Sequence, residues 1–401
     1  MNQKQTTNRP KKNRRKTALI SGGILIAILL LIGIAVGAIY YLCNVYKPNP
    51  EPLITGKAPS VTTDENGNTG TGDTGSNGDD NPPTVPQKEG FYNYLVLGKD
   101  VGGGNTDVFM LISFDTKNHS IALMQIPRDT YMEADGSHYK INSLYAHMRN
   151  RERRQNSGLS ESELTDAAMR DVCVALGNSL NMTIHYYAIM DLQGFRNIVD
   201  VLGGVYVDVP RDMTYVDKEQ NLHIYLKKGP QRLDGEKAEQ FVRFRKGYRL
   251  ADITRIDAQK IFMTALINQV KTSLTVNTVG GMVQQVIKYV DTSMPVSDMA
   301  HFAQEFFSVD NANIYMLTCP GEATYVEGIS YYVIHREQML YYVNRYFNVY
   351  EADINESDFD SGRVFVSEQY SDVLSIYEKA FEQPDNERTA EDITNNGLPL
   401  I

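Results

Sequence analysis

The sequence predicts an α/β fold: a layered domain with a central mixed β-sheet flanked by helices, behind one N-terminal transmembrane helix. Two observations lead to this prediction. After residue 90, apolar runs bounded by turn residues alternate with segments of helical periodicity, and this alternation is typical of layered α/β domains. Near the N-terminus, a long uncharged apolar run follows a group of basic residues, which is typical of a membrane anchor.

Residues 1–16 carry seven Lys or Arg side chains and no acidic one, and no charge occurs from Thr17 to Tyr46. The run "LISGGILIAILLLIGIAVGAIYYLC" exceeds the roughly 20 residues that a bilayer core requires. A secretory signal peptide would have a shorter apolar region and a small-residue cleavage site, so we favour an uncleaved transmembrane helix at residues 17–46. The positive-inside rule then makes residues 1–16 cytoplasmic and the main domain extracellular, in a single-pass membrane protein.

Residues 47–89 are rich in Gly, Pro, Asp, Asn and Thr and contain few large apolar residues. Because such a segment buries too little surface to offset the entropy of ordering, we expect a disordered linker. The extracellular domain is expected over residues 90–350. The acidic, weakly patterned residues 351–401 are expected to form a partly ordered C-terminal tail.

The elements of the extracellular domain can be assigned in order. Three apolar runs separated by turn residues predict strands at "FYNYLVLG", "DVFMLISFD" and "SIALMQIP". The segment "ESELTDAAMRDVCVALGNSL" has helical spacing and begins with a capping box of Ser160 and Glu163. Further along, we expect a strand at "HYYAIMD", a helix at "LQGFRNIVDVLGG", a strand at "VYVDVP", helices at "DGEKAEQFVR", "ADITRIDAQKIFMTALINQVKTSL" and "GMVQQVIKYV", a strand at 313–319 and a closing helix in 331–349.

The charge of the chain limits its possible partners. The formal net charge is −10, although the first sixteen residues are strongly basic, so the predicted extracellular part is even more acidic. General nucleic-acid binding is excluded, because it requires a basic surface. Any anion site must therefore be local.

Cysteine chemistry and common catalytic motifs give little support to other functions. The sequence contains no Gly-x-Ser-x-Gly, His-Glu-x-x-His or Cys-x-x-Cys motif. Cys173 and Cys319 could pair outside the cell or be buried as separate thiols, and we favour separate thiols.

Two aspartates flank the turn between the first two predicted strands. The first strand runs out to Asp100, glycines 102–104 reverse the chain, and the second strand begins at Asp107. Both carboxylates should therefore emerge at the same edge of the sheet. Two carboxylates, together with phosphate oxygens and water, are ligands that Mg²⁺ commonly accepts. Solvated turn residues are the alternative interpretation.

Arg128 follows the third predicted strand in "QIPRDTY". Pro127 interrupts the hydrogen-bond ladder, so Arg128 should lie at the end of the strand, where open α/β sheets bind their ligands. An Arg–Asp pair within a turn is the alternative interpretation.

The segment "FVRFRKGYRLADITRIDAQK", residues 241–260, contains four arginines. Arg243 and Arg245 share a face only on an extended chain, so the preceding helix should end near Val242. The summed positive charge of four arginines is enough to balance a pyrophosphate. These are Arg128, Arg243, Arg245 and Arg255.

The helix that follows should present Asp252, Arg255 and Gln259 on one face, because they occupy positions i, i+3 and i+7. A guanidinium group held by a carboxylate is well suited to bidentate phosphate binding. Ordinary surface ion pairs are the alternative interpretation.

Taken together, the ordered motifs resemble those of the LytR-CpsA-Psr (LCP) family of Gram-positive cell-envelope enzymes. The resemblance covers roughly residues 91–270 and is specific as an ordered set. It implies an Mg²⁺-dependent phosphotransferase that moves a glycopolymer, such as wall teichoic acid or capsular polysaccharide, from a polyprenyl-pyrophosphate carrier to peptidoglycan. It also implies an apolar tunnel for the lipid. The motifs are "LGKD", "NTD", "IPRDT", "KINSLY", "GFRNIVDVLGGVYVDVP", "LDGEKAEQFVRFR" and "DITRIDAQ".

The resemblance also implies residue roles. Asp100 and Asp107 would bind or position the metal. From the needs of phosphoryl transfer we expect one of these two aspartates to activate the acceptor hydroxyl. Asn105 and Ala258 stand where the family usually has arginines, which leaves two phosphate contacts missing or replaced by Lys140. The residues implied to hold the pyrophosphate or to support those that do are Arg128, Arg243, Arg245, Asp252, Arg255 and Gln259.

Two other functions stay open at this point. The same site could hydrolyse polyprenyl pyrophosphate with water. Alternatively, the protein could bind lipid-linked intermediates in the cell envelope without catalysis.

Overall fold

The predicted transmembrane helix at 17–46 lies outside the described residues, apart from Tyr46. In the part of the chain that is described, no helix is both long and apolar enough to cross a bilayer. The chain divides into one compact unit of Met1–Asn49 with Val296–Gln304 and a second of Pro50–Pro295 with Glu305–Ile401. The computed structural model describes residues 46–59, 61–63, 69–71, 85–100, 104–134, 136–218, 222–244, 251–273, 287–359, 365–382 and 387–398.

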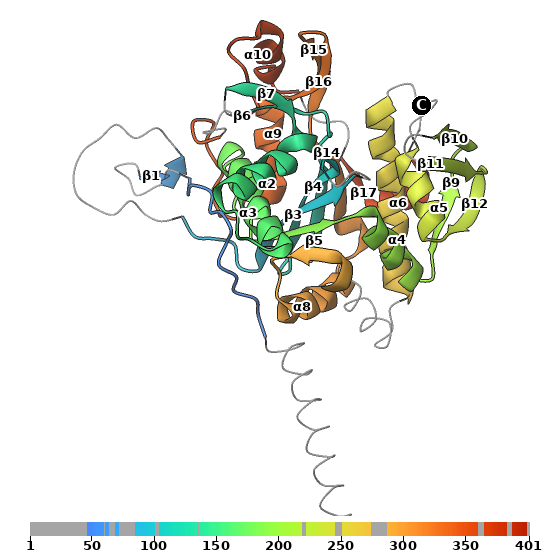
Figure 1. The fold of residues 1–401 in the computed structure, drawn as a ribbon. Helices are drawn as coiled ribbons and strands as arrows, with labels where there is room; N and C mark the ends of the chain where they lie inside the picture. The colour runs from blue at the N-terminus through green and yellow to red at the C-terminus, as the bar shows by residue number, and fades with distance from the viewer. Residues whose placement is uncertain are drawn as a thin grey trace, which may run out of the picture. The chain divides into compact units, whose positions relative to one another are not determined.

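A seven-stranded mixed sheet forms the centre of the second unit (Figure 1). Strands β3, β4 and β5 pair antiparallel in succession, while β8 lies parallel to β3 and β14 parallel to β5. The predicted α/β class with a central mixed sheet is confirmed. In sheet order the strands are β13 (Val290–Thr292), β8 (Tyr186–Met190), β3 (Phe91–Lys99), β4 (Thr106–Asp115), β5 (Ser120–Gln125), β14 (Ile314–Thr318) and β17 (Arg388–Thr389).

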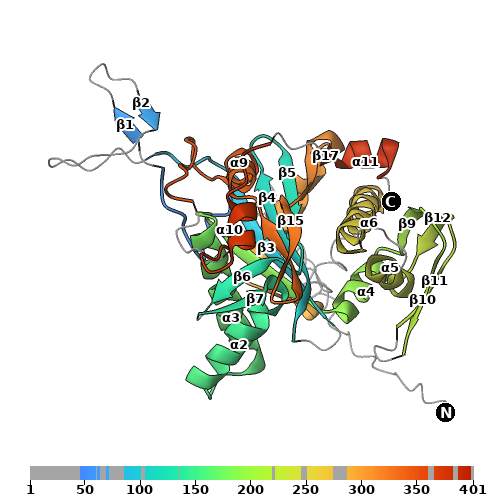
Figure 2. The ribbon, with the colours of Figure 1, turned by 90° about the horizontal axis from the view of Figure 1, so that it is seen from above.

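Helices cover both faces of this sheet (Figure 2). One face carries α2 (Leu144–Gln155), α3 (Glu161–Ser179), α9 (Arg336–Tyr342), the π-helical turn η3 (Val343–Phe347) and α10 (Ser371–Tyr377). Their apolar side chains join those of the strands in one large core. The predicted capping box at Ser160 and Glu163 begins α3, since each side chain binds the other's backbone N–H.

The other face carries α4 (Leu192–Val201), α5 (Gly235–Arg243) and α6 (Ala251–Ser273). A second core joins these helices to two small antiparallel sheets, in which β9 pairs with β12 and β10 with β11. Gly203 and Gly204 follow α4 with positive φ angles of 74° and 87°, as expected for glycines that end a helix. The paired strands are β9 (Val205–Val209), β12 (Gly229–Leu233), β10 (Met213–Asp217) and β11 (Leu222–Leu226).

The remaining elements are short or lie at the periphery. Much of the helix predicted at "GMVQQVIKYV" lies outside the described residues. The closing helix predicted in 331–349 begins only at Arg336, because Ile329–Ile334 form a strand of a hairpin. The remaining elements are β1 (Val61–Thr63), β2 (Thr69–Thr71), β6 (Tyr131–Ala134), β7 (Ser137–Lys140), η1 (Ile141–Ser143), α8 (Val296–Phe307), η2 (Asn311–Asn313), β15 (Gly321–Val326), β16 (Ile329–Ile334) and α11 (Ala390–Asn396).

The ends of the predicted linker are attached to the domain. Backbone groups of Leu53 and Ile54 bind Ile184, and the Tyr350 hydroxyl donates to the Gly56 carbonyl at 2.8 Å. Val85 is buried. Linker composition did not predict these contacts, because they depend on a few apolar residues within a polar stretch.

Part of the predicted tail also belongs to the domain. Arg388 and Thr389 add an edge strand to the central sheet, and Phe365 and Val373 lie in the main core. Cys173 and Cys319 are separate buried thiols, in agreement with the interpretation that we favoured.

Candidate functional site

The first predicted aspartate closes the turn between β3 and β4. The Asp100 carboxylate accepts hydrogen bonds from the backbone N–H groups of Gly104 and Asn105, at 3.2 and 3.4 Å. The Asp100 N–H in turn donates to the Asn105 carbonyl at 2.9 Å. This residue therefore has a structural role in the turn, and its carboxylate is held at the edge of the sheet.

The second aspartate lies at a β-bulge. The pairing of β3 with β4 passes from Gly98–Val108 to Lys99–Thr106, so Asp107 is the extra residue of β4. A bulge changes the direction of a side chain and often occurs beside active sites. The carboxylate of Asp107 binds Nη1 of Arg128 at 2.8 Å.

Arg128 lies three residues beyond the end of β5, in a turn whose backbone is fixed. The Thr130 N–H and hydroxyl both donate to the Pro127 carbonyl, at 3.0 and 2.6 Å. The Asn142 N–H donates to the Arg128 carbonyl at 3.1 Å. With its backbone held in this way and its side chain 22% exposed, Arg128 combines a defined position with access to solvent.

A second ion pair lies beside the first. Lys140 Nζ is 3.1 Å from Oδ1 of Asp129, and Nε of Arg128 is 4.0 Å from the same oxygen. Lys140 therefore adds a second cation beside Arg128. Asp129 was not assigned a role from the sequence, although the possibility of an Arg–Asp pair in this turn pointed to it. We call Asp107, Arg128, Asp129 and Lys140 the edge cluster.

Two glutamines connect the end of β5 to the helices on the other side of the sheet. The side-chain amide of Gln125, the last residue of β5, donates to the amide oxygen of Gln259 in α6. The amide of Gln259 donates to the Val242 carbonyl near the end of α5, at 3.2 Å. Gln259 was predicted to support the site, whereas Gln125 was not recognised. Through these bonds the end of α5 is tied to the strand that precedes Arg128.

Arg243 is the last residue of α5, and Phe244 after it is extended. The helix thus ends one residue beyond the predicted position. Nη1 of Arg243 binds Oε1 of Glu239 at 2.8 Å, and the other carboxylate oxygen of Glu239 binds Nε of Arg196. Glu239 is 5% exposed. A buried carboxylate therefore holds two arginines on this side of the sheet.

Three predicted site residues are not fully described. Arg245 lies outside the described residues, and Asp252 and Arg255 belong to the first turns of α6 but their side chains are not described. Within the described ranges, no group of three or more His, Cys, Asp or Glu side chains is arranged to hold a metal ion. Of the predicted site residues, the structure brings Asp107, Arg128 and Lys140 together. Gln259 binds Gln125 of β5 and also the carbonyl of Val242, the residue before Arg243.

The mixed sheet flanked by helices, with the edge cluster at the ends of its strands, defines a layered α/β protein. A model of the LytR_cpsA_psr family matches residues 59–347, and the chain belongs to this family.

Named relatives and a solved structure agree with this assignment. The chain is 30% identical to a polyisoprenyl-teichoic acid–peptidoglycan teichoic acid transferase, TagU of Bacillus mycoides, over 78% of this chain and 92% of TagU. It is 26% identical to the transferase TagV of Bacillus subtilis over 59% of this chain, and the match spans 56% of TagV. The crystal structure of B. subtilis TagV covers 63% of this chain and 94% of its own, with a TM-score of 0.50 and 25% identity.

Proposed function

We propose that this protein is a phosphotransferase that moves a glycopolymer from a polyprenyl-pyrophosphate carrier to peptidoglycan. Family membership and the names of the relatives support this function. The observation that carries it is the Asp107–Arg128 pair at a bulged strand end, joined through Gln125 and Gln259 to the helix that bears Arg243. Phosphoryl transfer requires positioning and charge neutralisation of this kind.

In this proposal the guanidinium groups of Arg128 and Arg243 hold the diphosphate, because their planar forks match phosphate oxygens. Lys140 adds a point charge. Arg245 and Arg255, with Asp252 in support, would complete the binding site as the sequence motifs imply. Asp107 already holds Arg128 and Glu239 already holds Arg243, so these two side chains lose little entropy when substrate binds.

The proposed reaction has a simple balance of bonds. The oxygen of a peptidoglycan hydroxyl attacks the phosphorus that carries the glycopolymer. The bond from that phosphorus to the bridging oxygen breaks, and polyprenyl phosphate leaves. The hydroxyl proton passes to the carboxylate of Asp107 or Asp100. A phosphodiester between glycopolymer and peptidoglycan results.

Asp100 and Asp107 fit Mg²⁺ in their chemistry, since this ion accepts one or two protein carboxylates and completes its shell with water and phosphate oxygens. When bound, Mg²⁺ supplies positive charge at the diphosphate oxygens. The Asp107 carboxylate also forms an ion pair with Arg128. A metal ion bound to Asp107 would therefore be coupled to the position of the Arg128 guanidinium group.

We also propose that residues 17–46 anchor the protein in the cell membrane, with residues 1–16 in the cytoplasm and the catalytic domain outside. The uncharged apolar run behind seven cations supports this placement. A site outside the membrane would have access to both the lipid carrier and the cell wall.

The test is a transfer assay. The full-length protein in detergent is mixed with a lipid-pyrophosphate-linked saccharide, peptidoglycan fragments and Mg²⁺. Mass spectrometry should detect the joined product with the wild type and little of it with Arg128→Ala. Free phosphorylated saccharide without joining would instead identify a hydrolase. Lipid binding without turnover would identify a binding protein, and either result would refute the proposal.

A further inference from the structure

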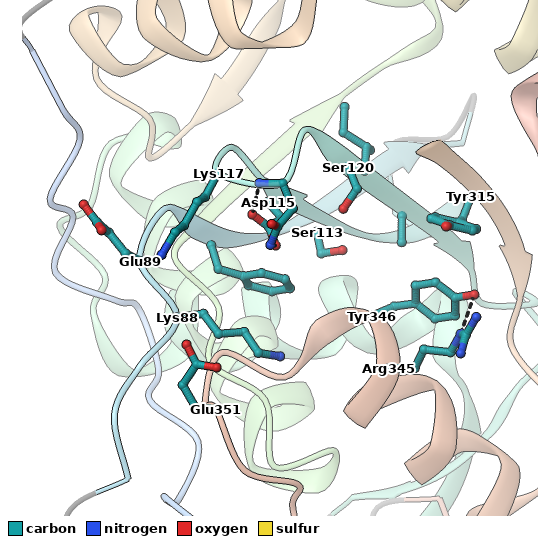
Figure 3. A pocket seen from close by; sticks show the side chains of 14 residues that line it. Lys88, Glu89, Ser113, Asp115, Lys117, Ser120, Tyr315, Arg345, Tyr346 and Glu351 are labelled. Atoms are coloured by element: carbon teal, nitrogen blue, oxygen red, sulfur yellow. Dashed lines mark hydrogen bonds between the residues drawn. The ribbon is translucent and has the colours of Figure 1, made fainter. Parts of the chain in front are cut away.

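Figure 3 shows a cavity against the central sheet. It lies at the end of β4 that carries Asp115, whereas Asp107 of the edge cluster lies at the other end of this strand. Its volume is about 330 Å³, within the range in which pockets hold small ligands. Asp115 in its wall lies eight residues along β4 from Asp107, which corresponds to about 26 Å at 3.3 Å per residue. The cavity is therefore distinct from the proposed diphosphate site.

Two small residues near this end of β4 and β5 leave room for the cavity. Ser113 in β4 pairs with Ala122 in β5, and Ala122 pairs with Tyr315 in β14. Cross-strand partners share one face of a sheet, so the small side chains form a floor beside the large ring of Tyr315. The ring centroid of Tyr346 in η3 is 5.0 Å from that of Tyr315.

Polar groups of both signs surround this floor. Figure 3 shows Lys88 and Glu351 on one side and Arg345 beside Tyr346 on the other, with Asp115 and Lys117 across the cavity. Three cations and three carboxylates line the wall in total. Since their formal charges balance, a strongly charged ligand gains little net attraction, whereas a neutral ligand with many hydroxyl groups finds both donors and acceptors.

The lining is also held in place before any ligand binds. Lys88 Nζ donates to the Asn348 carbonyl at 2.9 Å and lies 5.3 Å from the centroid of the Phe91 ring. Nε of Arg345 donates to the Tyr346 hydroxyl at 2.9 Å, and that hydroxyl donates to Glu387 at 2.8 Å. Such preorganisation lowers the entropic cost of binding.

We propose that this cavity binds one uncharged saccharide unit. The rings of Tyr315 and Tyr346 contribute apolar surface to the lining for the C–H groups of a pyranose, and the balanced polar wall satisfies its hydroxyl groups. The inference rests on the proposed function in one respect: the wall glycan that accepts the polymer is the source of such a unit. The cavity would hold one sugar of an extended glycan chain about 26 Å from the reacting groups. A hydroxyl group on another sugar of the same chain would then reach the edge cluster, and the second contact would keep the chain bound.

The probe is tri-N-acetylchitotriose, an uncharged N-acetylglucosamine trimer, titrated into the full-length protein in detergent by calorimetry and saturation-transfer NMR. The wild type should bind it. Ala122→Leu should abolish binding by filling the floor, and Glu351→Gln should weaken it about tenfold by removing a charged acceptor. The matched control Glu382→Gln, an exposed residue that is not part of the lining, should leave the affinity unchanged. If Ala122→Leu fails to fold, Glu351→Gln still decides.

Arg128→Ala should also leave trimer binding unchanged, so loss of transfer with retained trimer binding would separate the two proposals. The inference is overturned if the trimer does not bind at millimolar concentration or if Ala122→Leu and Glu351→Gln bind it like the wild type. It is also overturned if inorganic pyrophosphate binds and is lost in the same variants, because the cavity would then be an anion site.

Discussion

The residues of the candidate site act through pairs, and two of these pairs join segments that are distant in the sequence. Asp107 holds Arg128 across 21 positions, and Glu239 holds Arg196 across 43. Strand ends and turn residues predicted the location of Asp107 and Arg128. By contrast, Glu239 has the sequence signature of a polar helix residue, and only the packing of α5 against α4 makes it a buried partner of two arginines.

Arg128 should contribute more to activity than to stability, because its side chain lies partly in solvent. We expect Arg128→Ala to lower transferase activity by about 10²–10³-fold, as for loss of one charge-stabilising group. Arg128→Lys should recover only part of this, since lysine keeps the charge but not the fork. The activity assay and thermal unfolding should be measured together. A normal turnover rate in Arg128→Ala would contradict this role.

Glu239 is expected to be a positioning residue for Arg243. Glu239→Gln keeps the shape but weakens both ion pairs, so we expect about a tenfold loss of activity. The loss should appear in KM for the lipid-linked substrate if Arg243 binds the diphosphate. Glu236→Gln, in the exposed first turn of the same helix, is the matched control. Equal behaviour of the two variants would show that the pairing with Arg243 has no functional role.

At the scale of elements, local signals predicted much of the fold. Turn residues identified β3, β4 and β5, and a capping box identified the start of α3. Elements defined by long-range pairing were missed. β17 has only two residues and exists because it pairs with β14. The β15–β16 hairpin pairs locally but was missed for a different reason, because its aromatic stretch does not distinguish strand from helix.

His185 joins β3 to the start of β8 and makes this joint sensitive to acid. The Asn93 N–H donates to its Nδ1 at 3.0 Å, and burial lowers the pKa of His185 to about 4. Because the unfolded histidine has a pKa near 6.5, the unfolded state binds more protons between pH 4 and 6.5. Stability should therefore fall as pH decreases through this window, by up to about 3 kcal/mol.

The measurement is urea unfolding of the wild type and of His185→Leu at several pH values. Comparing the two proteins separates the contribution of His185 to the pH dependence of stability from that of the carboxylates. The difference between the two proteins should change across pH 4–6.5 and stay constant above pH 7. A constant difference across the whole range would mean that His185 titrates alike in both states.

At the scale of the whole molecule, composition predicted a partly ordered tail after residue 350, and several described residues of that region are buried in the domain. Ile393 of α11 is 5% exposed, and α11 follows directly on the edge strand β17. Acidic composition does not reveal such packing, because a few apolar residues at helical spacing are sufficient to attach a short helix.

Ile393→Ala should therefore lower the free energy of unfolding of the whole domain by about 2–5 kcal/mol, as for other buried truncations. Glu391→Ala, at an exposed position in the same helix, should change it by less than about 0.5 kcal/mol. Denaturant unfolding followed by far-ultraviolet circular dichroism is the measurement. If both variants unfold like the wild type, the C-terminal segment does not contribute to the domain.

The central claim is that Arg128 after β5 and Arg243 at the end of α5 bind one diphosphate, and a double-mutant cycle tests it most directly. Calorimetry would measure farnesyl pyrophosphate binding, with Mg²⁺, to the wild type, Arg128→Ala, Arg243→Ala and the double variant. If both guanidinium groups contact the same ligand, each single change weakens binding and the two effects are coupled by roughly 0.5–3 kcal/mol. Strictly additive effects, or unchanged affinity in either single variant, would contradict the account.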